Sequence, residues 1–284
     1  MTELSNKMKA GGTLRKIAGV VSVAAFALLI LLMANAGVRA RSQAAGGAQT
    51  PSAPTPRSLA PLDLTGYWVS VVTEDWRFRM IVPDKGDYSS VPLNPEGRKV
   101  ADSWDPAKDQ AEGNQCRSYG AAALLRIPGR LHIEWENDNT LRVDTDSGGQ
   151  TRLLHFGAAH PAVEAPQWQG YSLASWEGLR PPPPRTALQD ASQPNAPEGY
   201  LKVVTDHMKP GYLRKNGVPY GANASLEEYF DSFKELNGDV WLVVTSIVTD
   251  AQYLTQPFIT STHFKKLASA SGWDPTSCRS SEPR

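Results

Sequence analysis

The sequence predicts an all-β protein, an antiparallel β-barrel of about 8–11 strands, with a β-sandwich as the alternative. Short segments rich in β-branched and aromatic residues recur between residues 64 and 265, and turn-forming residues separate them. These segments alternate apolar and polar residues rather than following the 3.6-residue period of an amphipathic helix. No period of 20–50 residues repeats convincingly, which argues against a propeller.

An export segment precedes the predicted domain. Four basic residues stand before the apolar run 17–33, and the small-x-small tripeptide 34–36 follows, as signal peptidase prefers. We expect residues 1–40 to be a signal peptide or, if uncleaved, a membrane anchor, because about 17 apolar residues is near the lower limit for spanning a bilayer. The remaining chain is then exported to the periplasm or the extracellular space, or is anchored to the inner membrane by residues 17–33.

The composition after this segment is that of an ordinary soluble domain. The chain holds 29 basic and 29 acidic residues, and the export segment is basic, so the remainder is mildly acidic. A nucleic-acid-binding domain would carry a basic patch, so we expect no nucleic-acid partner. Residues 41–61 are rich in Ala, Pro and Gly and predict a disordered linker. The barrel domain is expected at 62–268, followed by a C-terminal tail at 269–284.

The two cysteines, Cys116 and Cys278, both lie in the exported part of the chain. In an oxidising compartment such a pair predicts a disulfide, which would tie the C-terminal tail back to a loop. Closing so long a loop stabilises the fold by about 4–5 kcal/mol in the chain-entropy model. Two free thiols are the alternative, and no neighbouring histidine gives the pair the spacing of a zinc site.

The first half of the domain contains a predicted β-meander. Strands are predicted at 64–72, 76–82, 121–127, 130–136, 140–146 and 150–156. The last four are separated by turns at Pro128-Gly129, 137–139 and 147–149, whose residues are typical of short hairpin loops. A short helix is predicted at 95–104.

The second half alternates strands with longer loops. Strands are predicted at 171–176, 200–205, 240–248 and 258–265. The segment 179–198 holds four consecutive prolines and predicts an exposed loop, partly polyproline II, and 208–222 predicts a second loop. Residues 227–236 are ambiguous, because Ser225 and Glu228 have capping-box spacing whereas Asn237-Gly238 is a hairpin signal. We favour a strand there.

Three phrases, at 168–178, 205–220 and 253–265, carry a resemblance to known sequences. The first, WQGYSLASWEG, resembles the W-x-G-x-S-x-x-x-W-E-G phrase of uncharacterised exported bacterial proteins, and the similarity covers about residues 64–265. The resemblance implies a lipocalin-like β-barrel and supports a strand at 227–236. It implies no activity and no catalytic residues.

Candidate catalytic residues are histidines that a barrel could bring near carboxylates. His132 shares a strand face with Glu134, and His155 and Asp206 lie on other predicted strands, so together they offer acid–base chemistry. Asp206 and His207 are adjacent in a strand and are expected to point to opposite faces. The histidines form no local metal motif, and no nucleophile elbow or phosphate loop is present, so we expect no metal and no cofactor. The alternative is a metal site assembled from distant strands.

Candidate ligand-binding residues come from two basic and aromatic segments. Arg77 and Arg79 share one face of the predicted strand 76–82, and two guanidiniums offer a carboxylate or phosphate site. The alternative is that this face is solvated. Tyr212 and Arg214 lie in the predicted loop 208–222, whose mixture of turn residues with basic and aromatic side chains is typical of a pocket rim.

Two functions from different classes fit these observations. In the first, the exported barrel binds a small, largely apolar molecule. In the alternative, it is an envelope enzyme, a hydrolase or isomerase, that uses His/carboxylate acid–base chemistry in the barrel. A structural envelope protein without a ligand is a third reading. A small molecule is the expected partner, and contact with the membrane is expected only through the N-terminal segment.

Overall fold

The computed structural model describes residues 53–157, 165–181 and 198–282. The predicted export segment and most of the proline-rich loop lie outside these residues. Within them, no helix combines the length and apolarity needed to cross a membrane. All of the described secondary structure belongs to the unit Pro54–Arg284, to which the following description applies.

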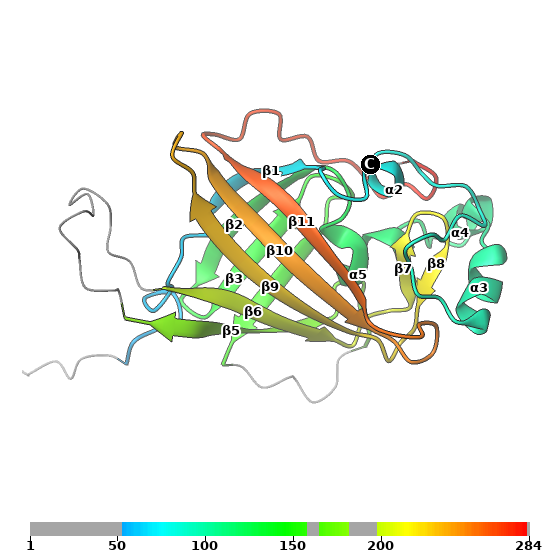
Figure 1. Ribbon diagram of the computed structural model, residues 1–284, viewed down its shortest axis with the longest axis horizontal. Helices are drawn as coiled ribbons and strands as arrows, with labels where there is room; N and C mark the ends of the chain where they lie inside the picture. Colours follow the sequence, from blue (N-terminus) through cyan, green and yellow to red (C-terminus); the bar gives the residue numbers. More distant parts are fainter. Residues whose placement is uncertain (1–52, 158–164, 182–197, 283–284) are drawn as a thin grey trace, which may run out of the picture. The chain divides into compact units, whose positions relative to one another are not determined.

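Nine of the described strands form a closed barrel (Figure 1), which confirms the predicted all-β fold class. The order around the barrel is β1 (Gly66–Val71), β11 (Phe258–Leu267), β10 (Val240–Thr249), β9 (Ser225–Lys234), β6 (Glu198–Asp206), β5 (Tyr171–Arg180), β4 (Thr151–Phe156), β3 (Thr140–Thr145) and β2 (Arg130–Asn137). Neighbours pair antiparallel except β4 and β5. Strand β1 pairs with both β11 and β2, so the barrel leaves no open sheet edge.

The interior of the barrel is packed with apolar side chains. Alternation turns every second residue of a strand inward, so that Leu131 and Ile133 of β2 are buried while His132 between them is not. The inward residues form one buried cluster. The partly buried Trp135 and Trp176 pack against this cluster and lie together with its Phe156, with ring centroids 5.3–6.4 Å apart.

One ion pair is buried among the inward residues. Arg152 donates from Nη1 and Nη2 to the two carboxylate oxygens of Glu228, at 3.1 and 2.7 Å. Its Nη2 also reaches Ser172 Oγ and Thr205 Oγ1 at 3.3 and 3.2 Å. Both charged side chains are almost completely shielded from solvent. A bidentate pair with further hydrogen bonds is the arrangement that makes such burial tolerable.

Short helices and a hairpin form a cap that packs on the barrel (Figure 1). The cap consists of α2 (Trp76–Arg79), α3 (Pro95–Asp102), α4 (Pro106–Ala111), η1 (Arg117–Tyr119), α5 (Ala121–Leu124), β7 (Gly211–Arg214) and β8 (Val218–Tyr220). Its buried residues form a cluster with Leu226, Val248 and Phe258 of the barrel strands. Helix α3 confirms the helix predicted at 95–104, and it begins with Pro95 after Asn94, whose side chain accepts from Gly97 N.

Two predicted strands and one predicted loop were wrong. The segment 76–82 contains α2, which begins after Asp75 turns the chain with a φ of 50°. The segment 121–127 contains α5, whose four residues are all buried, and periodicity cannot separate a buried helix from a buried strand. The loop predicted at 208–222 contains the β7–β8 hairpin. The strands at 130–136, 140–146, 150–156 and 227–236 were predicted correctly.

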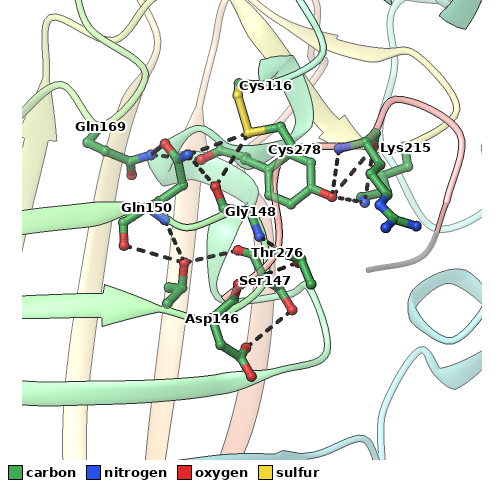
Figure 2. Close-up of a disulfide and its surroundings, with 12 residues drawn as sticks. Cys116, Asp146, Ser147, Gly148, Gln150, Gln169, Lys215, Thr276 and Cys278 are labelled. Atoms are coloured by element: carbon green, nitrogen blue, oxygen red, sulfur yellow. Dashed lines mark hydrogen bonds between the residues drawn. A yellow bond between two sulfur atoms is a disulfide. The ribbon is translucent and has the colours of Figure 1, made fainter. Parts of the chain in front are cut away.

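The predicted disulfide Cys116–Cys278 is present and fastens the tail to the cap (Figure 2). Thr276 N donates to Asp146 O at 2.8 Å, which continues the attachment along the tail. The expected linker ends before residue 61. Trp176 Nε1 donates to Pro56 O at 2.8 Å, so this part of the chain already contacts the barrel.

Candidate functional site

Three arginines from distant parts of the chain meet at one small cavity in the cap. Arg79 comes from α2, Arg126 follows α5, and Arg214 ends β7. The cavity has a volume of about 30 Å³, and Phe78, Ile81 and Leu213 are among the apolar side chains that complete its lining.

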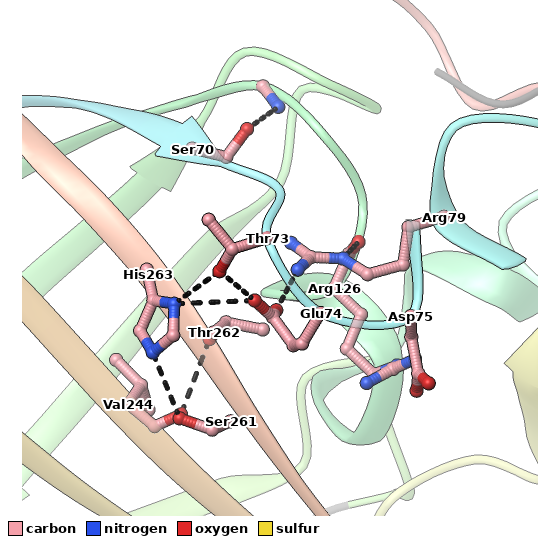
Figure 3. Close-up of polar contacts among 11 residues, drawn as sticks. Ser70, Thr73, Glu74, Asp75, Arg79, Arg126, Val244, Ser261, Thr262 and His263 are labelled. Atoms are coloured by element: carbon pink, nitrogen blue, oxygen red, sulfur yellow. Dashed lines mark hydrogen bonds and ion pairs between the residues drawn. The ribbon is translucent and has the colours of Figure 1, made fainter. Parts of the chain in front are cut away.

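Arg79 is positioned by hydrogen bonds on two of its three guanidinium nitrogens (Figure 3). Its Nε donates to Arg126 O at 2.8 Å, and Nη1 pairs with Glu74 Oε1. The third nitrogen, Nη2, is buried without a hydrogen-bond partner among the described residues. The guanidinium is therefore fixed in place with one donor uncommitted.

Arg126 and Arg214 are held in the same way. Arg126 Nη2 donates to Asp75 Oδ2 at 2.9 Å, while its Nη1 has no described partner. Arg214 Nη1 donates to Ser89 O at 2.6 Å, and its guanidinium lies 4.0 Å from the centroid of the Phe78 ring. Arg214 Nε and Nη2 are buried and unpaired within the described part of the chain. Arg214 is only 4% exposed.

The cavity is electropositive and short of acceptors. Burial lowers the pKa of Arg79 and of Arg214 to about 10 each, and the charge of Arg126 contributes in the same direction. Four buried guanidinium nitrogens of these three arginines lack an acceptor among the described residues, and a buried charged donor without a partner costs free energy. Guanidinium groups bind carboxylate and phosphate oxygens with matching fork geometry. The arrangement is therefore suited to an oxyanion.

Lys215 also lines the cavity, but its ammonium faces the C-terminal tail (Figure 2). Its Nζ donates to Tyr119 OH and to Glu282 O, both at 2.5 Å, and to Arg279 O at 3.3 Å. Burial lowers the pKa of Lys215 to about 7. The lysine therefore holds the tail against the cap rather than offering a donor to the cavity.

The structure brings together two of the four predicted ligand-binding residues. Arg79 and Arg214 line the cavity, whereas Arg77 is exposed and pairs with Asp87. Tyr212 lines a different cavity. Sequence reasoning missed Arg126, although a lone charge next to the apolar run 121–125 was a usable signal.

Of the predicted catalytic residues, the structure brings His132 and Glu134 together and places His155 on β4 and Asp206 at the end of β6. His132 and Glu134 lie on the outward-facing side of β2. Potential ligand atoms of these two side chains and of Asp144 all lie within 4.8 Å of one another, so the three residues could hold a metal ion. Asp144 already accepts from Arg142 Nε at 2.8 Å. His155 is elsewhere, with its ring stacked on Tyr171.

The expectation that Asp206 and His207 cannot pair was wrong. His207 Nδ1 lies 2.8 Å from Asp206 Oδ1. Strand β6 ends at Asp206, and His207 has a φ of 53°. The strict alternation of a strand therefore no longer applies at His207, and its ring turns back toward the carboxylate.

A different His–carboxylate pair lies beside the arginine cavity (Figure 3). His263 Nδ1 is 2.9 Å from Thr73 Oγ1 and 3.3 Å from Glu74 Oε2, the carboxylate that also pairs with Arg79. On the other side of the ring, His263 Nε2 is 3.5 Å from Ser261 Oγ. Strand alternation places Ser261 and His263 on one face of β11, but no local pattern predicts their contact with Glu74, which is distant from β11 along the chain.

Together, the barrel and the arginine cavity define a closed β-barrel protein with a candidate oxyanion site in its cap. The sequence matches no protein-family model. No curated protein and no solved structure is significantly similar to the chain. The cavity residues are therefore the basis for a functional assignment.

Proposed function

We propose that this protein binds a small organic acid, whose acidic group is held by Arg79, Arg126 and Arg214. The observation that supports the proposal is the set of four buried guanidinium nitrogens without acceptors around one cavity. A bound oxyanion supplies those acceptors, and it adds to the counter-charge that Glu74 gives Arg79 and that Asp75 gives Arg126.

The size of the cavity favours a carboxylate as the acidic group. A volume of about 30 Å³ accommodates about two water-sized atoms, which corresponds to the two oxygens of a carboxylate. The rest of the ligand would extend past Ile81, which lines the cavity and is 55% exposed. Trp76 and Met80 nearby on the chain are also exposed apolar side chains. These surroundings favour a small, largely apolar molecule that carries one acid group.

The export segment and the disulfide support an extracytoplasmic compartment. A disulfide is compatible with an oxidising environment, and the N-terminal segment has the features of an export signal. We propose that the protein acts in the periplasm or outside the cell, or anchored to the inner membrane. The ligand is then an extracytoplasmic small molecule.

Isothermal titration calorimetry with acetate, benzoate and inorganic phosphate tests this function. We expect benzoate to bind more tightly than acetate, and the variant Arg214→Met to lose at least tenfold in affinity, because methionine fills the space without donors. Arg142→Met, the same change on the barrel wall, serves as the control and should bind normally. Absence of binding by all three anions, or equal affinity of Arg214→Met and the unmodified protein, would refute the proposal.

The geometry of Ser261, His263 and Glu74 favours hydrolysis as a second candidate function. A hydroxyl near one ring nitrogen and a carboxylate near the other is the arrangement that activates a serine. The test is hydrolysis of p-nitrophenyl acetate by the purified protein. Activity abolished in both Ser261→Ala and His263→Ala would support this function, whereas activity unchanged in Ser261→Ala, or no activity above buffer, would exclude it.

A further inference from the structure

A second, larger cavity lies in the cap and shares the β7–β8 hairpin with the arginine site. It has a volume of about 290 Å³ and is bounded by α3, α4, η1 and the hairpin. Four aromatic side chains line it, namely Trp104, Tyr212, Tyr220 and Tyr253. It has no lining residue in common with the arginine cavity, because a different part of the hairpin faces each.

The hydroxyl of Tyr220 is the first sign that this cavity is built for a ligand. Tyr220 is 1% exposed, and its OH has no hydrogen-bond partner among the described residues. The backbone of Gly120 and of Gly211 lies against the hydroxyl, because a Cβ added to either glycine would clash with it, and Gly211 also lines the cavity. Burial raises the pKa of this hydroxyl. An unpaired buried hydroxyl costs free energy, which a ligand that reaches it past Gly211 would recover.

A rigid polar triangle forms another part of the wall. Arg117 Nη1 donates to Asp109 Oδ1 at 2.8 Å and to Tyr212 OH at 3.0 Å. Tyr212 OH in turn donates to Asp109 Oδ2 at 2.9 Å. Burial and the bond to Asp109 raise the pKa of Tyr212 to about 12. The Tyr212 ring is therefore held in one position before any ligand arrives, which lowers the entropic cost of binding.

The charges around the cavity select against ionic ligands. Carboxylates are contributed by Asp105, Asp109 and Glu112, and cations by Lys108 and Arg117. An anion would be repelled by the carboxylates, and a cation would be repelled by Lys108 and Arg117. A ligand with hydroxyl groups can donate to the carboxylates and accept from the cations, because each hydroxyl does both.

We infer that this cavity binds a neutral, polyhydroxylated ring of the size of a single sugar. The aromatic side chains offer faces of negative potential to the ring's C–H groups, and Tyr220 supplies a hydrogen bond to one hydroxyl. The volume lies near the lower end of the range for ligand pockets, about 300 Å³, which suits one ring rather than two. The inference is independent of the proposed acid-binding function, since it concerns other residues.

Saturation-transfer NMR with glucose, galactose, mannose and N-acetylglucosamine tests the inference. We expect at least one of these sugars to receive transfer in the millimolar range, and Tyr220→Phe to weaken its binding at least fivefold. Tyr229→Phe removes a hydroxyl from the outer barrel wall, where Glu227 is its partner, and should leave sugar binding unchanged. Benzoate binding at the arginine cavity should be the same in all three proteins, which separates this test from that of the proposed function.

Thermal unfolding keeps the test interpretable if Tyr220→Phe is impaired for another reason. Without sugar, Tyr220→Phe should be at least as stable as the unmodified protein, because it removes only an unpaired hydroxyl. If it fails to fold, Tyr212→Phe replaces it, and weaker binding of the same sugar is again expected. The inference is overturned if none of the four sugars shows transfer, if the variant binds equally well, or if tetramethylammonium binds in their place.

Discussion

Arg77 and Arg79 lie two positions apart on α2, yet their side chains are 59% and 1% exposed. A helix turns by about 100° per residue, so the two point in nearly opposite directions. Arg77 meets Asp87 at the surface, whereas Arg79 reaches the arginine cavity. The same residue type on one short helix therefore provides a matched pair for testing the site.

The first prediction uses this pair in thermal unfolding with and without benzoate. A ligand at 100 times its Kd stabilises the folded state by about 2.7 kcal/mol, and we expect this gain in the unmodified protein and in Arg77→Met. Arg79→Met should lose most of the gain. Equal stabilisation of both variants by benzoate would contradict a role for Arg79 in the cavity.

The pH dependence of benzoate binding separates the arginines from Lys215. Binding an anion requires the protonated guanidinium, so affinity should stay level between pH 6 and 9 and fall as pH rises through about 10, the lowered pKa of Arg79 and Arg214. If the Lys215 ammonium supplied the charge, affinity would fall near its pKa of about 7. Calorimetry across this range decides between them, and a decrease centred near pH 7 would contradict the assignment.

The difference between Arg77 and Arg79 also shows which structural elements could be predicted from patterns in the sequence. Alternation and turn residues identified β2, β3 and β4, because a half-buried strand imposes a period of two on its own sequence. The same pattern at 76–82 was misleading, since α2 is too short to display a helical period and is held by contacts with distant residues. Arg126 Nη2 meets Asp75, for example, although the two are 51 positions apart.

The candidate site was predictable only in part for the same reason. Arg79 and Arg214 were identified from residue type and local turn chemistry. Their convergence depends on the packing of α2 against the β7–β8 hairpin, and no local pattern encodes that contact. The pairing of His263 with Glu74 likewise joins β11 to a loop far away in the chain.

The ion pair inside the barrel gives a prediction about stability. Glu228→Gln leaves the charge of Arg152 buried without its counterion, and we expect a loss of about 3–5 kcal/mol. The double variant Arg152→Met/Glu228→Leu removes both charges and should recover most of that loss, since Ser172 Oγ and Thr205 Oγ1 are already 2.8 Å apart and can satisfy each other. Urea unfolding measures both. A double variant as unstable as Glu228→Gln would contradict this account.

The disulfide should contribute to stability through its long loop. Cys116 and Cys278 are 162 positions apart, and the chain-entropy model assigns such a crosslink about 5 kcal/mol. We expect Cys116→Ser/Cys278→Ser to lose up to this amount in urea unfolding and to show faster hydrogen exchange around Thr276. Reduced unmodified protein is the control and should match the variant. A loss below about 1 kcal/mol would mean that Lys215 and the other tail contacts suffice.

Two glycines with positive φ allow backbone strain to be separated from packing in the cap. Gly217 has a φ of +82°, and a Cβ there would lie 2.2 Å from Trp104 Cβ, whereas Gly238 has a φ of +90° and open space around it. Gly238→Ala should therefore lose only the backbone term, about 1–2 kcal/mol. Gly217→Ala should lose more, because Trp104 must move, and its displacement should also weaken sugar binding in the larger cavity. Equal losses of stability in thermal unfolding would show that Trp104 moves without cost, and that it is not a rigid part of the wall of that cavity.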